Sequence, residues 1–349
     1  MLRLETEIVT VRTMHPFVIA RGGSSEWKTV TVRVVDGDGA EGWGEAAPSR
    51  FYGETAETVV AVLERLRPIV ETADPWRIEE TERALATAIR GNAAARCAVS
   101  AALHDLQGKR LGVPLWKLWG LAPDAAPRSS FTIAIAADEA TLRARVREAV
   151  DAGYPILKIK LGTDRDEAIV RAVRAEAPHA ILRVDANAAW TPKRALAIIP
   201  LLAELGVEFV EQPLPAHDLE GTRFVRERSA LPIVVDESCL VATDVAKVAG
   251  VADGVNLKLA KCGSLREALR IVHAARAHDM LVMAGCMIET SLGITAAAHL
   301  APLLDAVDLD GAALLADDPY VGATIANGVV TLPEAPGLGV ARRAPRLVG

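Results

Sequence analysis

The sequence predicts an α/β fold in which a (β/α)8-type, TIM-like barrel follows an N-terminal α+β capping domain. Two observations carry this prediction. First, five charged residues end short apolar runs at intervals of 22 to 26 residues, which is about the length of a strand, a helix and two loops. They are Lys160, Asp185, Glu211, Asp236 and Lys258. Second, the first third of the chain has a different pattern, in which strands are followed by helices.

The capping domain is expected over residues 1–122. Alternating apolar and polar residues predict three strands, and an Asp-Gly-Asp-Gly sequence predicts the turn between the last two. Apolar residues at helical spacing then predict three helices. The strands are expected at Leu2–Arg12, Thr29–Val35 and Glu41–Ala46, and the helices at Thr55–Val70, Trp76–Ile89 and Ala93–Gly108. Residues Pro123–Arg128 are interpreted as the linker.

The barrel domain is expected over residues 123–320, because strand, loop and helix patterns recur there. Its eight strands are predicted at Phe131–Ile135, Leu157–Leu161, Ile181–Asp185, Phe209–Gln212, Ile233–Asp236, Val255–Leu259, Leu281–Gly285 and Ala306–Leu309. Pro192 directly after Thr191 marks the start of one intervening helix. Residues 321–349, with a strand-like stretch at Gly328–Leu332, are expected to return to the capping domain.

Composition excludes several classes of function. The 349 residues carry a formal net charge of −6 and contain no basic block, which argues against nucleic acid as a partner. The start of the chain lacks the apolar core of a signal peptide, and no uncharged run is long enough to span a membrane. Four cysteines without CxxC spacing are typical of reduced thiols. We therefore expect a cytoplasmic enzyme without membrane partners, and we also expect a homo-oligomer.

Asp185, Glu211 and Asp236 end three consecutive predicted strands, so in a barrel they meet at the mouth, where the active sites of this fold lie. Oxygen ligands without His or Cys favour one Mg²⁺ ion per subunit, with Mn²⁺ as an alternative. A single carboxylate after a strand more commonly caps the next helix, but three in series favour a metal site. Asn187 and Glu237 lie within two residues of these ligands and are expected to orient them.

Lys158 and Lys160 are two residues apart in LKIKLG, so both side chains face the same side of one strand. Buried lysines are costly unless they reach anions, and the flanking apolar residues argue against a solvated surface strand. Lys160 is interpreted as a proton-transfer base, and Lys158 as a cation that lowers its pKa and binds a substrate carboxylate. Lys258 comes from the opposite side of the barrel. One lysine could therefore remove a proton and the other return it on the far face.

Asp308 and Asp310 follow the last predicted barrel strand. Their two-residue spacing predicts a shared strand face, which suits the binding of a buried ammonium group. An exit turn with two solvated aspartates explains the same spacing equally well.

The stretches LKIKLG, VDANAAW, VEQPL, VVDES and NLKLAKCGSL resemble the muconate-lactonizing branch of the enolase superfamily. CAVSAALHDLQGKRLGVPLWKLWG also resembles the end of that family's capping domain, so the resemblance covers nearly the whole chain. It implies that Mg²⁺ bound by Asp185, Glu211 and Asp236 stabilises an enediolate formed when a lysine removes an α-proton. Lys160 and Lys258 would be the paired bases.

Three further stretches resemble the dipeptide epimerases of this branch. They are PFVIARGGSSEW and WGEAAPSRFYGET in the capping loops, and AGCMIETSLGITAAAHLA followed by VDLDG. The resemblance implies 1,1-proton transfer at the α-carbon of the C-terminal residue of a dipeptide such as L-Ala-D/L-Glu, from peptidoglycan recycling. Arg21 would meet the acidic side chain of the substrate, and Asp308 and Asp310 its ammonium. Thr132 and Cys286 are expected to line the same pocket.

Several alternatives remain open at this point. N-acylamino acid racemases and o-succinylbenzoate synthases use the same scaffold, but their substrates lack the ammonium that the two aspartates would bind. Muconate-type cycloisomerisation does not require both lysines. Acid-sugar dehydration is disfavoured because MAGCM, at the end of the seventh strand, contains no His. A non-catalytic barrel that binds a ligand is disfavoured by the complete set of carboxylates and lysines.

Overall fold

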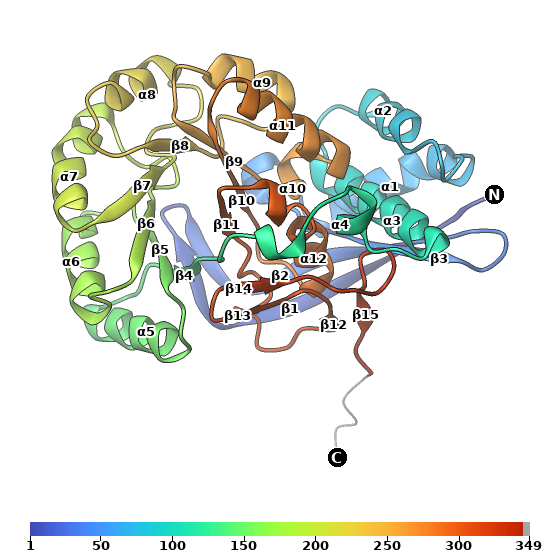
Figure 1. The fold of residues 1–349 in the computed structure, drawn as a ribbon, viewed down its shortest axis with the longest axis horizontal. Coiled ribbons are helices and arrows are strands. Elements are labelled where there is room, and N and C mark those ends of the chain that lie inside the picture. The colour runs from blue at the N-terminus through green and yellow to red at the C-terminus, as the bar shows by residue number, and fades with distance from the viewer. Residues whose placement is uncertain (345–349) are drawn as a thin grey trace.

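A computed structural model describes residues 1–344, which form an antiparallel capping sheet with helices and an eight-stranded parallel barrel (Figure 1). None of the helices in this range is long and apolar enough to cross a membrane. The barrel strands follow one another around the sheet in chain order. The first and last barrel strands meet where the Ser130 backbone N–H donates to the Val307 carbonyl at 3.0 Å. The predicted fold class is therefore confirmed.

The capping region consists of a three-stranded sheet covered by helices. Its strands are β1 (Arg3–Ile19), β2 (Gly22–Val35) and β3 (Glu41–Ala46), and its helices are α1 (Ala56–Glu71), α2 (Ile78–Ala88), α3 (Ala93–Leu111) and α4 (Leu115–Leu118). The three long helices lie within three residues of their predicted ends. A capping box formed by Thr55 and Thr58 begins α1.

The barrel strands lie within two residues of their predicted ends. They are β4 (Phe131–Ile133), β5 (Ile156–Lys160), β6 (Ile181–Asp185), β7 (Val207–Glu211), β8 (Ile233–Val235), β9 (Gly254–Leu257), β10 (Leu281–Gly285) and β11 (Ala306–Asp308). The intervening helices are α5 (Glu139–Asp151), α6 (Asp166–Glu176), α7 (Pro192–Glu204), α8 (Leu219–Arg226), α9 (Ala242–Val248), α10 (Leu259–Cys262), α11 (Leu265–Ala277) and α12 (Ser291–Ala298). Aliphatic side chains between strands and helices form the core.

The first two strands are longer than predicted. β1 ends at Ile19 and β2 begins at Gly22. The alternation of apolar and polar residues had predicted an end at Arg12 and a start at Thr29. The pairing register shifts between Arg12 and Phe17, and this bulge interrupts the alternation that identifies a strand. The stretch interpreted as a capping loop is therefore a paired hairpin.

The end of the described chain lies against the capping sheet. It contains the short strands β12 (Tyr320–Val321), β13 (Thr324–Ala326), β14 (Val329–Thr331) and β15 (Ala341–Arg342). The Tyr320 hydroxyl lies 2.8 Å from that of Thr31, and Arg342 forms an ion pair with Glu7 at 2.8 Å. The domain boundaries at 122/123 and 320/321 stay a prediction, and residues 345–349 lie outside the described range.

Helix α3 packs on β3 without intervening side chains. A Cβ atom at Gly42 would overlap the Ala102 carbonyl oxygen, and one at Gly44 would overlap that of Ala98. The strand and the helix can approach this closely only because both strand positions lack a side chain.

We expect Gly44→Ala to lower the free energy of unfolding by about 2 kcal/mol, because the added methyl group must separate β3 from α3. Urea unfolding followed by circular dichroism measures the change. Gly37→Ala is the control, since no atom lies within 4 Å of its new methyl group. Equal stability of the two variants would contradict the close packing of helix and strand.

Candidate active site

The five regularly spaced charged residues meet at the mouth of the barrel. Lys160, Asp185 and Glu211 are the last residues of β5, β6 and β7, and their positions pair directly across the sheet. Asp236 follows β8, and Lys258 follows β9. None of the three acidic residues caps a helix, because the caps of α7, α8 and α9 are at residues 191, 218 and 241.

Each of these carboxylates is buried and lies beside a lysine ammonium group. Lys160 Nζ is 2.7 Å from Asp185 Oδ2, and Lys258 Nζ is 2.8 Å from Asp236 Oδ2. Lys158, which points inward from the same strand as Lys160, has its Nζ 2.7 Å from Glu211 Oε2. The structure therefore brings together all five residues and Lys158.

Lys261 contributes a further cation beneath Asp236. Its ammonium contacts Asp236 Oδ1 and donates to the backbone carbonyls of Asp236 at 2.7 Å and Asn256 at 2.9 Å. These contacts tie helix α10 to the ends of β8 and β9. The residue therefore holds Asp236 in place and presents no free ammonium to the mouth.

The pKa values of these carboxylates follow from burial and from their neighbours. Burial alone would raise the pKa of Asp185, but Lys160 and Lys158 outweigh it and lower that pKa to about 2. Burial and the nearby charge of Asp185 raise the pKa of Glu211 to about 7. For Asp236 the effect of burial is outweighed by Lys258 and Lys261, which lower its pKa. Of these three carboxylates, Glu211 is therefore the one whose negative charge is least compensated by nearby lysines.

The donor set fits a divalent metal ion. Asn187 Oδ1 and Glu237 Oε2 are buried oxygens that accept no hydrogen bond from the described residues, and Glu211 Oε2 is contacted by the Lys158 ammonium alone. Within residues 1–344 no three acidic, histidine or cysteine side chains are already grouped as metal ligands, and lysine ammonium groups contact oxygens of Asp185 and Glu211. Asp185, Glu211 and Asp236 would bind the ion through oxygen atoms, which suits Mg²⁺.

Asn187 contacts the predicted metal ligand Asp185, and both Asn187 and Glu237 contact Arg21 of the capping hairpin. The Asn187 backbone N–H donates to Asp185 Oδ1 at 2.8 Å, and its amide donates to Asp185 Oδ2 at 3.1 Å. Arg21 reaches across from the β1–β2 turn and pairs with Glu237 Oε1 at 2.8 Å and with the Asn187 carbonyl at 2.7 Å. Its guanidinium also stacks over Phe51, 4.2 Å from the ring centre. The hairpin therefore covers one side of the mouth.

The predicted ammonium site lies on the other side of Lys158. Asp308 Oδ2 is 2.8 Å from Lys158 Nζ, and Asp308 Oδ1 accepts a hydrogen bond from the Ser130 hydroxyl at 2.7 Å. Asp310 Oδ2 accepts from the Thr132 backbone N–H at 2.6 Å. Burial and the charge of Asp308 raise the pKa of Asp310 to about 7. β11 ends at Asp308, so Asp310 lies two residues beyond the strand, yet both carboxylates contact Thr132.

Cys286 lies beside the same aspartates. It directly follows β10, and burial together with the charges of Asp310 and Glu289 raises the pKa of its thiol. The side chain of Thr132 also approaches Asp308, with Oγ1 3.4 Å from Oδ1. Both residues predicted to line the pocket therefore lie next to it.

Sequence reasoning missed two residues that position the carboxylates. The Asn256 amide donates to Glu211 Oε1 at 2.8 Å, and Gln212 Oε1 accepts from the Asp236 backbone N–H at 2.8 Å. Asn256 could have been found, because it lies two residues before Lys258 and so on the same face of the predicted strand Val255–Leu259. Gln212 left no comparable signal, since its side chain bridges to the next strand.

Comparisons with known proteins agree with this geometry. Residues 3–120 match the family described as mandelate racemase / muconate lactonizing enzyme, N-terminal domain, and residues 141–345 match the enolase C-terminal domain-like family. An L-Ala-D/L-amino acid epimerase of Maribacter sp. is 40% identical over 97% of this chain and 99% of its own.

Two solved structures are also similar. The dipeptide epimerase of Enterococcus faecalis V583, in complex with Mg and L-Leu-L-Tyr, has a TM-score of 0.93 at 33% identity and covers 97% of this chain and 99% of its own. The N-succinyl Arg/Lys racemase of Bacillus cereus has a TM-score of 0.91 at 25% identity, and the match covers 98% of this chain and 95% of its own. This chain therefore belongs to the mandelate racemase / muconate lactonizing enzyme family of the enolase superfamily, among the dipeptide epimerases.

Proposed function

We propose that this chain is a Mg²⁺-dependent dipeptide epimerase that inverts the α-carbon of the C-terminal residue of a dipeptide of the L-Ala-D/L-Glu kind. The observation that carries the proposal is the placement of Lys160 and Lys258. Their strands, β5 and β9, are the second and sixth of eight in the barrel, so the two amines lie on opposite sides of the mouth. The three carboxylates lie on or next to the strands between them.

The two lysines would move the proton. Lys160 as a neutral amine takes the α-proton from one face, and Lys258 as an ammonium returns a proton on the opposite face, which inverts the centre. In the reverse direction the roles exchange. Asp185, Glu211 and Asp236 would hold a Mg²⁺ ion, which would lower the cost of the negative charge that develops on the substrate carboxylate. Lys158, deep among carboxylates, is proposed to orient that substrate carboxylate.

Asp308 and Asp310 would bind the dipeptide ammonium. Lys158 already compensates the charge of Asp308, whereas Asp310 forms no ion pair with a residue of the described range. Burial and then the charge of Asp308 raise the pKa of Asp310, which supports the proposal because an ammonium group would compensate this carboxylate. Thr132 and Cys286 are proposed to border this group, and Arg21 to meet the C-terminal side chain.

Racemisation of N-acylamino acids is the second candidate. It needs the same lysines and metal ligands, and the similarity to the N-succinyl Arg/Lys racemase favours it. N-acylated substrates have no ammonium group, so they would leave Asp310 buried without compensation. The same reasoning disfavours o-succinylbenzoate synthesis, and muconate-type cycloisomerisation leaves one lysine without a role.

Further features complete the proposal. We infer one Mg²⁺ ion per subunit, replaceable by Mn²⁺ because both accept oxygen ligands. We also infer a homo-oligomer that acts in the cytoplasm on dipeptides released during peptidoglycan recycling. Calorimetric titration with Mg²⁺ and light scattering test the stoichiometry and the oligomeric state.

The reaction is tested by incubating a dipeptide library in D₂O with Mg²⁺ and measuring α-deuterium by mass spectrometry. We expect Lys160→Ala and Lys258→Ala each to reduce epimerisation at least about 100-fold, since each removes one proton-transfer group. Each variant should still exchange the α-hydrogen of only one stereoisomer, and that isomer should differ between them. Lys247→Ala, an exposed lysine on α9, is the control. Symmetric loss of exchange in both variants would refute the two-base assignment.

Asp310→Asn should lower kcat/KM for free-amino dipeptides about 30-fold or more, because it removes the carboxylate proposed to bind the ammonium. Activity towards N-acetylated analogues should change little. Steady-state kinetics on matched substrate pairs measures the ratio, with the exposed Asp317→Asn as control. Equal losses on both substrate types would favour the N-acylamino acid alternative.

Mg²⁺ at one hundred times its dissociation constant should add about 2.7 kcal/mol of stability and raise the Tm by a few degrees, because the ion binds only the folded chain. Differential scanning calorimetry before and after chelation measures the shift. Glu211→Gln should abolish it, whereas Glu208→Gln, on the same strand with a half-exposed side chain, should not. A shift that persists in Glu211→Gln would place the metal elsewhere.

A further inference from the structure

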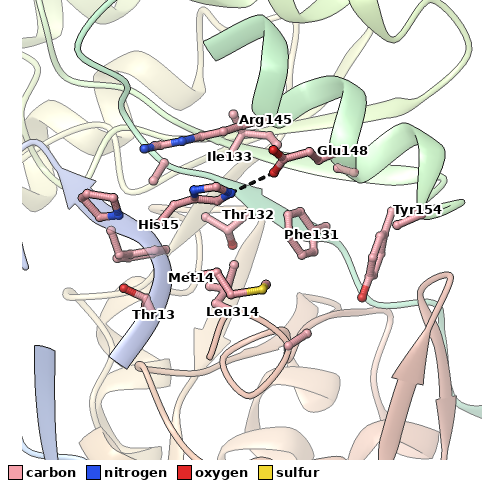
Figure 2. A pocket seen from close by; sticks show the side chains of 16 residues that line it. Thr13, Met14, His15, Phe131, Thr132, Ile133, Arg145, Glu148, Tyr154 and Leu314 are labelled. Atoms are coloured by element: carbon pink, nitrogen blue, oxygen red, sulfur yellow. Dashed lines mark hydrogen bonds and ion pairs between the residues drawn. The ribbon is translucent and has the colours of Figure 1, made fainter. Parts of the chain in front are cut away.

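A lateral cavity of about 260 Å³ lies between the capping hairpin and the outside of the barrel (Figure 2). Strand β4, helix α5, the bulged part of β1 and the turn after β11 form its walls. Thr132 is the one lining residue that also belongs to the predicted site. The lysines and metal ligands of the mouth are not part of its wall. The cavity is therefore distinct from the proposed active site.

The cavity exists because the ring of helices is incomplete. Among residues 1–344 no helix follows β11, so the flank of α5 lacks the neighbour that an eighth helix would provide. The register shift in β1 brings His15 and Phe17 into this gap instead, and Met14 N–H donates to the Leu314 carbonyl at 2.9 Å. Because a strand is thinner than a helix, β1 does not fill the gap completely, and space remains beside Phe131 and Tyr154.

Arg145, a cation in the cavity wall, has donors without an acceptor among residues 1–344. The Nε and Nη1 atoms of Arg145 are buried and donate no hydrogen bond to a described residue. Glu148, one helical turn further along α5, is already paired with His15 Nε2 at 2.8 Å, as Figure 2 shows. Buried guanidinium donors without acceptors are costly, so this wall favours an anion.

The rest of the wall is largely apolar. The rings of Phe131 and Tyr154 pack with their centres 4.6 Å apart, and the Tyr154 hydroxyl donates to the Ile325 carbonyl at 3.2 Å. Met14, Phe17 and Leu314 complete the apolar surface. The carboxylate of Glu148 disfavours a second negative charge nearby. The wall therefore suits a ligand that carries a single negative charge on an otherwise apolar body.

We propose that the lateral cavity binds a small apolar monocarboxylate. The carboxylate pairs with the free donors of Arg145, and its aliphatic or aromatic body lies against Phe131 and Tyr154. Neither the proposed reaction nor its substrate enters this inference, because the ligand is recognised by residues outside the mouth.

Calorimetric titration of the full chain with 3-phenylpropionate tests the proposal. We expect a dissociation constant on the order of 1 mM and at least tenfold weaker binding of the uncharged 3-phenylpropanamide. Arg145→Gln should weaken carboxylate binding at least tenfold. Arg147→Gln is the matched control, since this arginine lies on the same helix but pairs with Glu176 outside the cavity.

A second variant keeps the test independent of the charge change. Ala152→Phe places a ring into the cavity from an exposed position, so it should block binding without lowering the Tm. The proposal is overturned if the unmodified chain shows no heat of binding at 10 mM ligand, or if acid and amide bind equally. It is also overturned if Arg145→Gln or Ala152→Phe binds as the unmodified chain does.

Discussion

The constraint on which the mouth of the barrel depends is the compensation of buried charge. Four buried carboxylates lie among four buried lysines, namely Asp185, Glu211, Asp236 and Asp308 with Lys158, Lys160, Lys258 and Lys261. Burying the carboxylates without the lysines, or the lysines without the carboxylates, would cost a large free energy of desolvation. The balance is uneven, because the pKa of Glu211 and of Asp310 is raised to about 7 while that of Asp185 is lowered to about 2. Glu211 and Asp310 lie where the proposal places a metal ion and an ammonium group.

Much of this arrangement was predictable because it depends on local periodicity. A strand of about five residues carries its charged residue at the end that opens on the mouth, so regular spacing alone brings Lys160, Asp185 and Glu211 together. Contacts that join distant parts of the chain left no such pattern. The bulge in β1 conceals a hairpin, and nothing in the sequence pairs Arg21 with Glu237. The positioning role of Gln212 likewise depends on its neighbour across the sheet.

The capping region also helps to define the mouth. Beyond the contact between Arg21 and Glu237, Glu45 of β3 accepts hydrogen bonds from the backbone N–H groups of Thr290 at 3.0 Å and Gly293 at 3.1 Å. It thereby caps helix α12, whose own N-cap is Thr290. Two points of the cap are thus tied to different parts of the barrel, Arg21 to the loops after β6 and β8 and Glu45 to the helix after β10.

The incomplete ring of helices connects these observations. Because no helix follows β11 in the described chain, Asp310 lies in a turn rather than at a helix start, and its carboxylate can accept the Thr132 backbone N–H. The same gap leaves the outer side of β4 open to the lateral cavity. Thr132 therefore borders the cavity and also holds the carboxylate proposed to bind the substrate ammonium. A ligand beside Arg145 that shifted β4 would also move the Thr132 backbone N–H. Strand β4 therefore connects the lateral cavity with the mouth of the barrel.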